Sequence, residues 1–392
     1  MLKFANRVQD LQTEGALQVL ARAKELEAGG REIIHLEVGE PDFPTPGNIC
    51  QSAIQAIQNG HTKYTSVRGV PALREAIAER ASKRRDNISL DAQRIVVGPG
   101  GKPLLFFPAM AILNPGDEVL YPDPGFPTYR EMIKIAGGVP VPVPLYEENN
   151  FSFDLNAFDR LINQKTRLII INTPGSNPTG SVIPPEDLKH IAEAARRYDC
   201  WVMSDEMYEN IVFDNLQVAS ILTLPGMDER TIVVDGFSKT FAMTGWRLGY
   251  AIMPKELATR VELLLTHGTG STAEFTQIAG IEAMTGDQTE CRKMVEAFQV
   301  RRDRFIAGLN SIPGVHCLSP KAAFYAFPNI KSFGIRSSEL SARILNETGV
   351  ALLPGTAFGQ YGEGYLRLSF ANSIENLDKA IEKLRQFFKN IK

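Results

Sequence analysis

Short apolar segments alternate with longer amphipathic ones through the middle of this 392-residue chain, and this alternation constrains the fold more than any other feature. The apolar segments predict strands and the amphipathic segments predict helices, three of which start near a proline. Strands and helices that alternate in this way form a mostly parallel sheet with helices on both faces, an α/β fold. The predicted strands are residues 94–98, 118–121, 167–172, 201–205, 231–236 and 248–253, and the predicted helices include residues 71–85, 102–113, 185–198 and 254–264.

The two ends of the chain predict a second, smaller unit. A charged helical pattern covers residues 290–309, and a last helix is expected behind a Ser373 cap, where apolar residues recur at a spacing of three or four. The first 45 residues contain a helix and a short strand, so we expect them to pack with this C-terminal part. We predict a large domain of residues 47–288 and a small α+β domain of residues 1–46 and 289–392. Further strand-like segments are residues 33–38, 323–327 and 365–370.

Charge and cysteine content exclude several functional classes. The net charge is −3, without the basic surplus that nucleic-acid binding needs. The four cysteines lie far apart with no CxxC spacing, which favours reduced thiols in a cytoplasmic protein over a disulfide frame or a zinc site. Asn6 and Arg7 stand where a signal peptide would need an apolar run, and no apolar stretch is long enough to span a bilayer. We therefore expect no metal, no membrane and no nucleic acid.

Lys239 lies just past the apolar run of residues 231–234, where a lysine is costly unless its charge is neutralised or used. Arg247 follows eight residues later, between Gly245 and Gly249. An amine that can form an imine, beside an arginine that can bind an anion, suits a pyridoxal phosphate enzyme. The alternative is that both are solvated surface charges.

A glycine-rich loop, Gly98-Pro-Gly-Gly-Lys102, joins a predicted strand to a predicted helix. Small residues at a helix N-terminus allow bare N–H groups to approach a phosphate. Taken alone, the loop favours a plain tight turn. It matches neither a P-loop nor the GxGxxG fingerprint, which argues against a nicotinamide dehydrogenase.

Three more segments follow predicted strands, and the carboxyl ends of parallel strands are where such sheets bind ligands. Asn172-Thr-Pro-Gly-Ser-Asn-Pro-Thr-Gly180 is a stiff loop that can hold the Asn177 amide at a fixed point. Asp205 can pair with a protonated ring nitrogen, or it can cap a helix. Tyr208 can donate to a ring oxygen, and Phe126 can stack on a flat cofactor or belong to the core.

Together these segments resemble, along essentially the whole chain, a class I pyridoxal phosphate-dependent aminotransferase of fold type I. The Asn172–Gly180 motif, the Asp205/Tyr208 pair and the Ser238-Lys239 … Gly245-Trp-Arg247-Leu-Gly249 signature stand in the order and spacing of that family. The Gly100-Gly-Lys102 loop resembles the bacterial aspartate aminotransferase-like subgroup.

The resemblance implies a role for each of these residues. Lys239 would carry the cofactor as an internal aldimine and, once released, shuttle a proton. Arg367 would grip the substrate carboxylate, which the backbone at Gly39 also contacts, and Tyr64 would reach the partner subunit's phosphate, which implies a homodimer with shared active sites. The remaining implied contacts are Asp205 to the ring nitrogen, Asn177 and Tyr208 to the ring oxygen, Phe126 to the ring face, Gly101, Lys102, Ser238 and Arg247 to the phosphate, and Asn177 and Lys102 also to substrate.

Two positions depart from the family pattern. Gly236 stands where many relatives have a phosphate-binding serine, three residues before the lysine, so the phosphate has one fewer hydroxyl donor. Tyr129 stands where some members have a histidine that supports the ring aspartate. Both features also occur in the bacterial subgroup.

The resemblance implies the transfer of an amino group between an L-amino acid, with aspartate or glutamate favoured, and a 2-oxo acid. Alternatives are an aromatic or broad-range aminotransferase, or a β-lyase or amino-acid oxidase that uses the same cofactor and fold. A ligand-sensing regulator would need a DNA-binding domain, which we do not expect because the aminotransferase-like segment begins almost at Met1.

Overall fold

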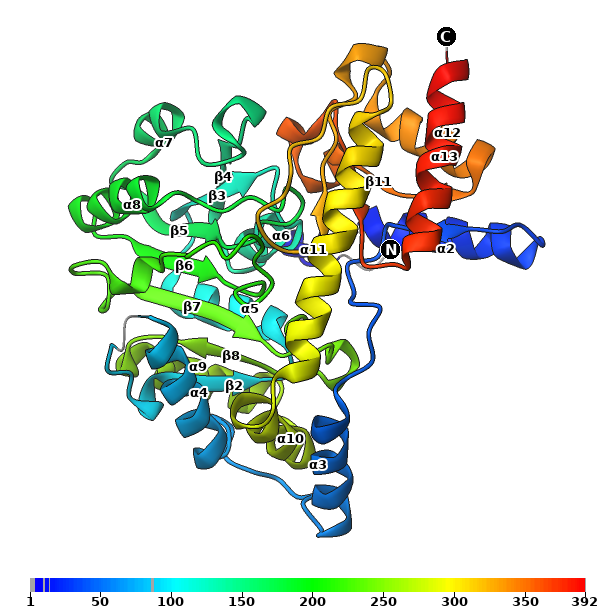
Figure 1. The fold of residues 1–392 in the computed structure, drawn as a ribbon. Coiled ribbons are helices and arrows are strands. Elements are labelled where there is room, and N and C mark those ends of the chain that lie inside the picture. The colour runs from blue at the N-terminus through cyan, green and yellow to red at the C-terminus, as the bar shows by residue number, and fades with distance from the viewer. Residues whose placement is uncertain (1–3, 10, 14, 86–87, 392) are drawn as a thin grey trace.

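A seven-stranded sheet forms the centre of the molecule in the computed structural model, which describes residues 4–9, 11–13, 15–85 and 88–391 (Figure 1). β8 runs antiparallel to its neighbours β2 and β7, and every other neighbouring pair is parallel. The mostly parallel sheet predicted from the sequence is therefore confirmed. The strand order is β2 (Ile95–Gly98), β8 (Gly249–Ile252), β7 (Thr231–Gly236), β6 (Trp201–Asp205), β5 (Thr166–Asn172), β3 (Glu118–Asp123) and β4 (Val139–Pro144).

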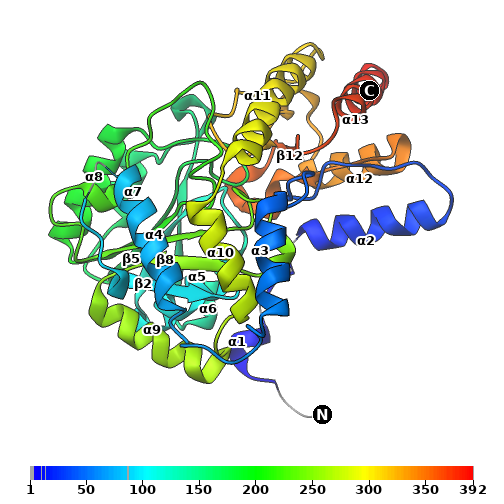
Figure 2. The same ribbon diagram turned by 60° about the horizontal axis from the view of Figure 1, so that its bottom comes forward.

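Helices cover both faces of this sheet because successive strand residues point to opposite sides. Met203 packs with one group of helices, whereas its neighbour Val202 packs with another. The first face carries α5 (Gly101–Ile112), α6 (Thr128–Ile135) and α9 (Lys255–Gly268). The second carries α4 (Pro71–Arg84), α7 (Leu155–Leu161), α8 (Pro185–Arg197) and α10 (Glu274–Thr285), and α3 (Gly47–Gln58) lies beside α10 (Figure 2).

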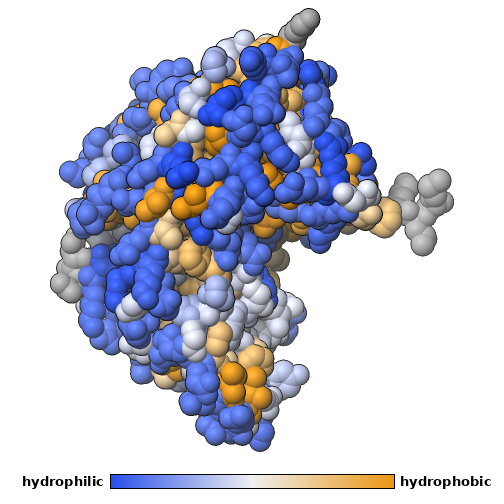
Figure 3. Space-filling view, turned by 45° about the vertical axis from the view of Figure 1, so that its right-hand side comes forward, coloured by the Kyte–Doolittle hydropathy of each residue, from blue (hydrophilic) through white to orange (hydrophobic). Residues whose placement is uncertain are grey.

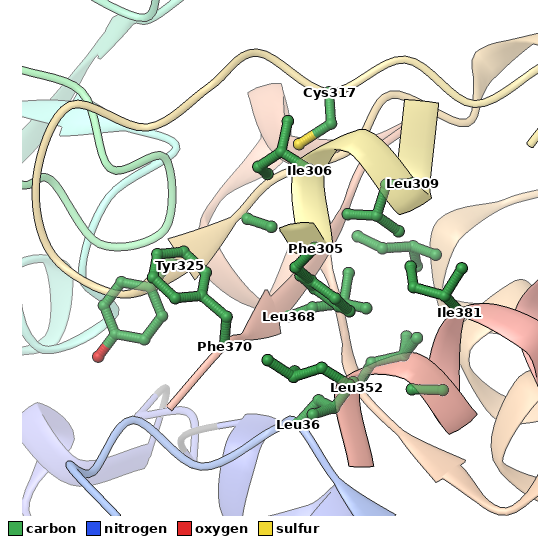
Figure 4. Packing of buried hydrophobic residues seen from close by; sticks show 14 of the residues in the cluster. Leu36, Phe305, Ile306, Leu309, Cys317, Tyr325, Leu352, Leu368, Phe370 and Ile381 are labelled. Carbon is green, nitrogen blue, oxygen red and sulfur yellow. The ribbon is translucent and has the colours of Figure 1, made fainter. Parts of the chain in front are cut away.

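A second apolar core joins the two ends of the chain. β1 (Ile34–His35) pairs in parallel with β10 (Val350–Ala351), and Leu36 packs with Phe305, Leu352 and Phe370 (Figure 4). This agrees with the expectation that the first segment packs with the last, although the domain boundaries stay a prediction. The other elements of this region are α2 (Gly15–Ala28), α11 (Thr289–Asn310), β9 (Tyr325–Ala326), α12 (Ser337–Thr348), β11 (Leu353–Pro354), β12 (Leu366–Ser369) and α13 (Ile374–Asn390). α1 (Asn6–Gln9) lies apart from them and contacts α6.

Most predicted elements lie within a few residues of their observed bounds, and β6 and β7 have the predicted ones. The helix predicted for residues 254–264 runs instead from Lys255 to Gly268, with Pro254 in the capping position before it. The predicted elements did not include β4 or the helices α3, α6, α7, α10 and α12. Of the helices in the described part of the chain, none is long and apolar enough to cross a membrane.

Candidate active site

A cavity of about 300 Å³ opens beside the carboxyl ends of β5, β6 and β7. It brings together every site residue predicted from the sequence except Tyr64, although these residues come from segments between positions 39 and 367. The lining residues among them are Gly39, Gly101, Lys102, Phe126, Asn177, Asp205, Tyr208, Ser238, Lys239, Arg247 and Arg367. The segments that follow the predicted parallel strands therefore meet at the carboxyl edge of the sheet in the folded chain.

Lys239 lies in the loop that follows β7, and its Nζ donates a hydrogen bond to the backbone oxygen of Gly39. Burial lowers the pKa of the Lys239 ammonium to about 8, and the nearby charges of Arg367, Arg247 and Lys102 act in the same direction. The neutral amine, which is the form that attacks a carbonyl, is therefore more populated near neutral pH than in an ordinary lysine.

Asp205 ends β6 and is almost fully buried. Burial raises the pKa of its carboxyl group to about 6, although hydrogen bonds from Tyr129 Oη (2.6 Å) and from the backbone N–H of Met207 (3.2 Å) oppose this rise. The carboxylate is therefore anionic at neutral pH. The helix-cap alternative for Asp205 is wrong, because no helix begins in the described stretch from residue 206 to residue 220.

Tyr129 was noted in the sequence only as a departure from a family pattern. Its hydroxyl, on a fully buried ring of α6, donates directly to Asp205. The tyrosine thus supports the aspartate from the position where some relatives carry a histidine.

Asn172 fixes the neighbouring loop, a role that the sequence analysis did not assign. Its Nδ2 donates to the backbone oxygen of Asp205 at 3.0 Å, and its Oδ1 accepts from the backbone N–H of Asn177 at 2.9 Å. These two bonds tie Asn177 to the end of β6. The Asn177 Oδ1 atom is buried and has no hydrogen-bond partner in the structure.

Arg367 lies on β12 with only 3% of its surface exposed. One of its terminal nitrogens, Nη2, donates to the backbone oxygen of Glu37 at 2.9 Å, whereas Nε and Nη1 are buried without a partner. The guanidinium lies over the ring of Tyr325, 4.7 Å from its centroid. Burial lowers the pKa of Arg367, but an arginine keeps its charge in proteins. Two unused donors on a buried cation fit a carboxylate ligand.

The glycine-rich loop opens α5 directly against Arg247. A Cβ on Gly100 would lie 2.3 Å from Arg247 Nη2, and Gly100 has a φ of +94°, so a side chain is excluded there by space and by backbone conformation. Gly101 is the first residue of α5, and the buried Ser238 lines the same cavity. A helix N-terminus beside an arginine is suited to bind a phosphate.

Phe126 and Lys102 lie on one side of the cavity. Lys102 Nζ is 5.6 Å from the centroid of the Phe126 ring, and this ring packs edge-on against Tyr129. Phe126 is partly exposed to the cavity, so its face is available to a flat ligand.

Tyr64 lies outside the cavity, and 99% of its surface is exposed in the single chain. The structure therefore brings it into contact with none of the other predicted site residues. Its expected contact is with a partner subunit, and this contact stays a prediction.

The unsatisfied atoms test whether the cavity fits pyridoxal phosphate and a substrate carboxylate. Nε and Nη1 of Arg367 are buried donors without a partner, and leaving such groups unpaired is costly, so they fit an acceptor such as a substrate carboxylate. The cavity also offers a carboxylate for a ring nitrogen and a helix N-terminus for a phosphate. The residues present therefore fit this cofactor.

Comparison with known proteins gives one answer over nearly the whole chain. Residues 31–384 match the family model described as "Aminotransferase class I and II". An aspartate aminotransferase of Pyrococcus abyssi is 40% identical over 371 residues, which cover 94% of this chain and 95% of the relative.

Solved structures agree with the sequence comparison. The aspartate aminotransferase from Rhizobium meliloti superposes with a TM-score of 0.95 at 33% identity, covering 100% of both chains. An aromatic aminotransferase from Pyrococcus horikoshii superposes with a TM-score of 0.89 at 39% identity, covering 94% of this chain and 98% of that one. The chain therefore belongs to the class I and II aminotransferases, the pyridoxal phosphate-dependent enzymes that exchange amino groups between amino acids and 2-oxo acids.

Proposed function

We propose that this aminotransferase takes its amino group from an acidic L-amino acid, aspartate or glutamate, and passes it to a 2-oxo acid such as 2-oxoglutarate. One observation carries the proposal: Lys239, Asp205, Arg367 and Lys102 line a single cavity. An amine, an anion and a carboxylate-binding cation are the groups that transamination requires, and Lys102 adds a cation for a second carboxylate.

The cofactor contacts that the family resemblance implies fit the chemistry of each side chain. Asp205 would pair with the ring nitrogen, the Asn177 Nδ2 and Tyr208 hydroxyl groups would donate to the ring oxygen, and Phe126 would cover the ring face. Gly101, Lys102, Ser238 and Arg247 would surround the phosphate. When bound, pyridoxal phosphate supplies a ring that withdraws electrons from the substrate α-carbon. Asp205 keeps the ring nitrogen protonated, because its own pKa of about 6 leaves it anionic at neutral pH.

Lys239 has two tasks in this proposal. Its amine would hold the cofactor, and once the substrate amine has taken its place, the free amine would accept the proton from the substrate α-carbon. A base near neutral pKa is efficient in such a transfer, and burial brings the pKa of Lys239 to about 8.

Arg367 orients the substrate through its α-carboxylate. Nε and Nη1 are the two nitrogens left without a partner, so the guanidinium has donors available for a carboxylate. The backbone at Gly39 lies close to this position, because both Gly39 and the Arg367 guanidinium lie against Tyr325. This contact is common to all amino acids and does not select a side chain.

A second candidate is an aromatic or broad-range aminotransferase. Apolar side chains of Leu105, Pro127 and Phe358 line part of the same cavity, and one similar structure is that of an aromatic aminotransferase. Such a wall would accept a ring without a partner for a second carboxylate.

Lys102 distinguishes the two candidates. The rate of each half-reaction should be measured with aspartate, glutamate, phenylalanine and alanine for the wild type, Lys102→Ala and Lys102→Arg. We expect Lys102→Ala to lose roughly tenfold or more with the acidic donors and much less with phenylalanine and alanine, since it removes a charge-assisted contact. Lys102→Arg should retain part of that preference. Equal losses with all four donors would leave Lys102 as a phosphate-loop residue and remove the basis for an acidic substrate.

The proposed assembly is a homodimer in which each subunit lends Tyr64 to its partner's site. Tyr64 is fully exposed in the single chain, and Ile54 and Ile57 on nearby α3 are about half exposed. Figure 3 shows apolar surface at the lower end of the molecule, where α3 lies in Figure 1. Exposed apolar surface of this kind favours a protein partner. A cytoplasmic location is proposed from the four free cysteines.

A further inference from the structure

Tyr325 belongs to the apolar core and to the cavity at once. Its ring, only 1% exposed, packs in the cluster that joins the two ends of the chain. Its hydroxyl points out of that cluster (Figure 4) and lines the cavity. Nothing in the sequence distinguished this tyrosine from an ordinary core residue.

The Tyr325 hydroxyl meets the hydroxyl of Tyr208 at 2.6 Å. The two rings meet edge-on, with centroids 5.7 Å apart, so packing holds the pair in this geometry. Gly39 lies directly against the Tyr325 hydroxyl, because a Cβ at this position would be only 2.4 Å from the hydroxyl oxygen. Within the described residues this is the one hydrogen bond that either hydroxyl makes.

The number of hydrogens on the two hydroxyl groups limits which tyrosine can donate this hydrogen bond. Burial raises the pKa of both tyrosines, so each hydroxyl keeps its single hydrogen. If Tyr208 donated to Tyr325, Tyr208 would have no hydrogen left for a ligand in the cavity. If Tyr325 donates, the hydrogen of Tyr208 is free to face the cavity.

Arg367 favours the second arrangement. Its guanidinium lies 4.7 Å from the centroid of the Tyr325 ring. A cation beside a phenol stabilises negative charge on its oxygen and makes its O–H group the stronger donor. Asp205 acts on Tyr208 in the opposite sense, because a nearby anion disfavours negative charge on that oxygen.

We propose that Tyr325 is a positioning residue that donates its hydrogen to Tyr208 and thereby directs the hydrogen of Tyr208 to the cofactor's ring oxygen. This inference rests on the proposed function, in which Tyr208 holds that oxygen. A hydroxyl group that accepts one hydrogen bond becomes a stronger donor in another, because the two bonds polarise each other. Tyr208 is therefore a better donor with Tyr325 in place. Tyr325 does not contact the cofactor in this arrangement and acts through Tyr208.

The test uses the holoenzyme and the absorbance of its bound cofactor, titrated across the neutral and alkaline range. A hydrogen bond donated to the ring oxygen lowers the pKa of the neighbouring nitrogen, because it stabilises the negative charge that otherwise attracts the nitrogen's proton. Losing the bond therefore raises the pH midpoint of the spectral change. We expect Tyr208→Phe to raise the midpoint by about 1 to 2 pH units, the size of a hydrogen bond to a charged group. Tyr325→Phe should raise it by about 0.3 pH unit, since it removes only the polarising bond.

The double variant decides whether Tyr325 acts through Tyr208. We expect Tyr208→Phe/Tyr325→Phe to have the same midpoint as Tyr208→Phe alone. Tyr365→Phe is the matched control, because it also removes a buried tyrosine hydroxyl, one bonded to Glu147 outside the cavity, and it should leave the midpoint unchanged. Phenylalanine keeps the ring packing in each case, and thermal unfolding of each variant confirms that it is folded.

Two results would overturn the inference. The first is a wild-type midpoint in Tyr325→Phe, and the second is a shift in the double variant equal to the sum of the single shifts. A failure of the proposed function looks different, because a wild type without cofactor bound at Lys239 would show no spectral change to titrate.

Discussion

The hydrogen bonds around Asp205 stabilise the negative charge of its carboxylate. Its carboxylate accepts hydrogen bonds from Tyr129 and Met207, and burial would otherwise favour its neutral form. We predict that Asp205→Asn still binds cofactor but loses roughly 100-fold or more in turnover, because an amide cannot hold the ring nitrogen protonated. The measurement is kcat with the preferred donor.

Tyr129→Phe is the matched control for that experiment. It keeps the carboxylate and removes one donor to it, so its loss should be smaller, about tenfold. Near-normal turnover in Asp205→Asn would reduce Asp205 to a structural residue.

The second prediction for a single residue concerns Arg367. Arg367→Ala should raise KM for all amino donors together, by an amount corresponding to about 2–5 kcal/mol, because it removes half of a buried charge-assisted pair. Arg367→Lys should recover part of the binding, since it keeps the charge but not the fork. An effect confined to acidic donors would place Arg367 at the side chain rather than at the α-carboxylate.

Residues of the site differ in how far sequence could predict them. Lys239, Asp205 and Arg367 stand in motifs that a family resemblance identifies, and all three line the cavity. Asn172, Tyr129 and Tyr325 escaped assignment, because their importance lies in bonds to residues 33, 76 and 117 positions away. The spacing of residue types along a chain does not record such contacts.

At the scale of elements, the strands of the central sheet were predicted except β4, whereas several helices, α3 and α10 among them, were not. β4 was missed because prolines occupy every second position of Val139–Pro144 and argue against a strand. The structure tolerates them because β4 is an edge strand that, among the described strands, pairs with β3 alone, so no second ladder is lost. α13, by contrast, follows its apolar spacing closely, with Leu377, Leu384 and Phe388 buried.

One prediction concerns the contribution of the N-cap of α13 to stability. The Ser373 side chain accepts a hydrogen bond from the backbone N–H of Asn376, as the sequence predicted. Ser373→Ala should lower the free energy of unfolding by about 1 kcal/mol, whereas Ser373→Asp should keep it, because aspartate caps equally well. Urea unfolding with an unchanged slope measures both. Equal stability of the alanine and aspartate variants would mean that the bond contributes nothing.

The whole molecule is predicted to work as a dimer. Tyr64 is 99% exposed and lines no part of the cavity of its own chain, so its proposed role needs a second copy. Tyr64→Ala subunits should be mixed with Lys239→Ala subunits after both have been found weakly active or inactive. We expect recovery to about one quarter of the wild-type rate, because half of the dimers are mixed and each mixed dimer has one intact site. No recovery despite confirmed subunit exchange, or a fully active monomer, would contradict shared sites.

The central claim is that Lys239 binds the cofactor, and borohydride reduction followed by peptide mapping tests it most directly. Reduction fixes an imine on the lysine that formed it, and mass spectrometry then locates the added mass. The account predicts the modification on Lys239, in the wild type and equally in Lys102→Ala, with loss of the visible absorbance. Fixation on any other lysine, or none in a protein saturated with pyridoxal phosphate, would contradict it.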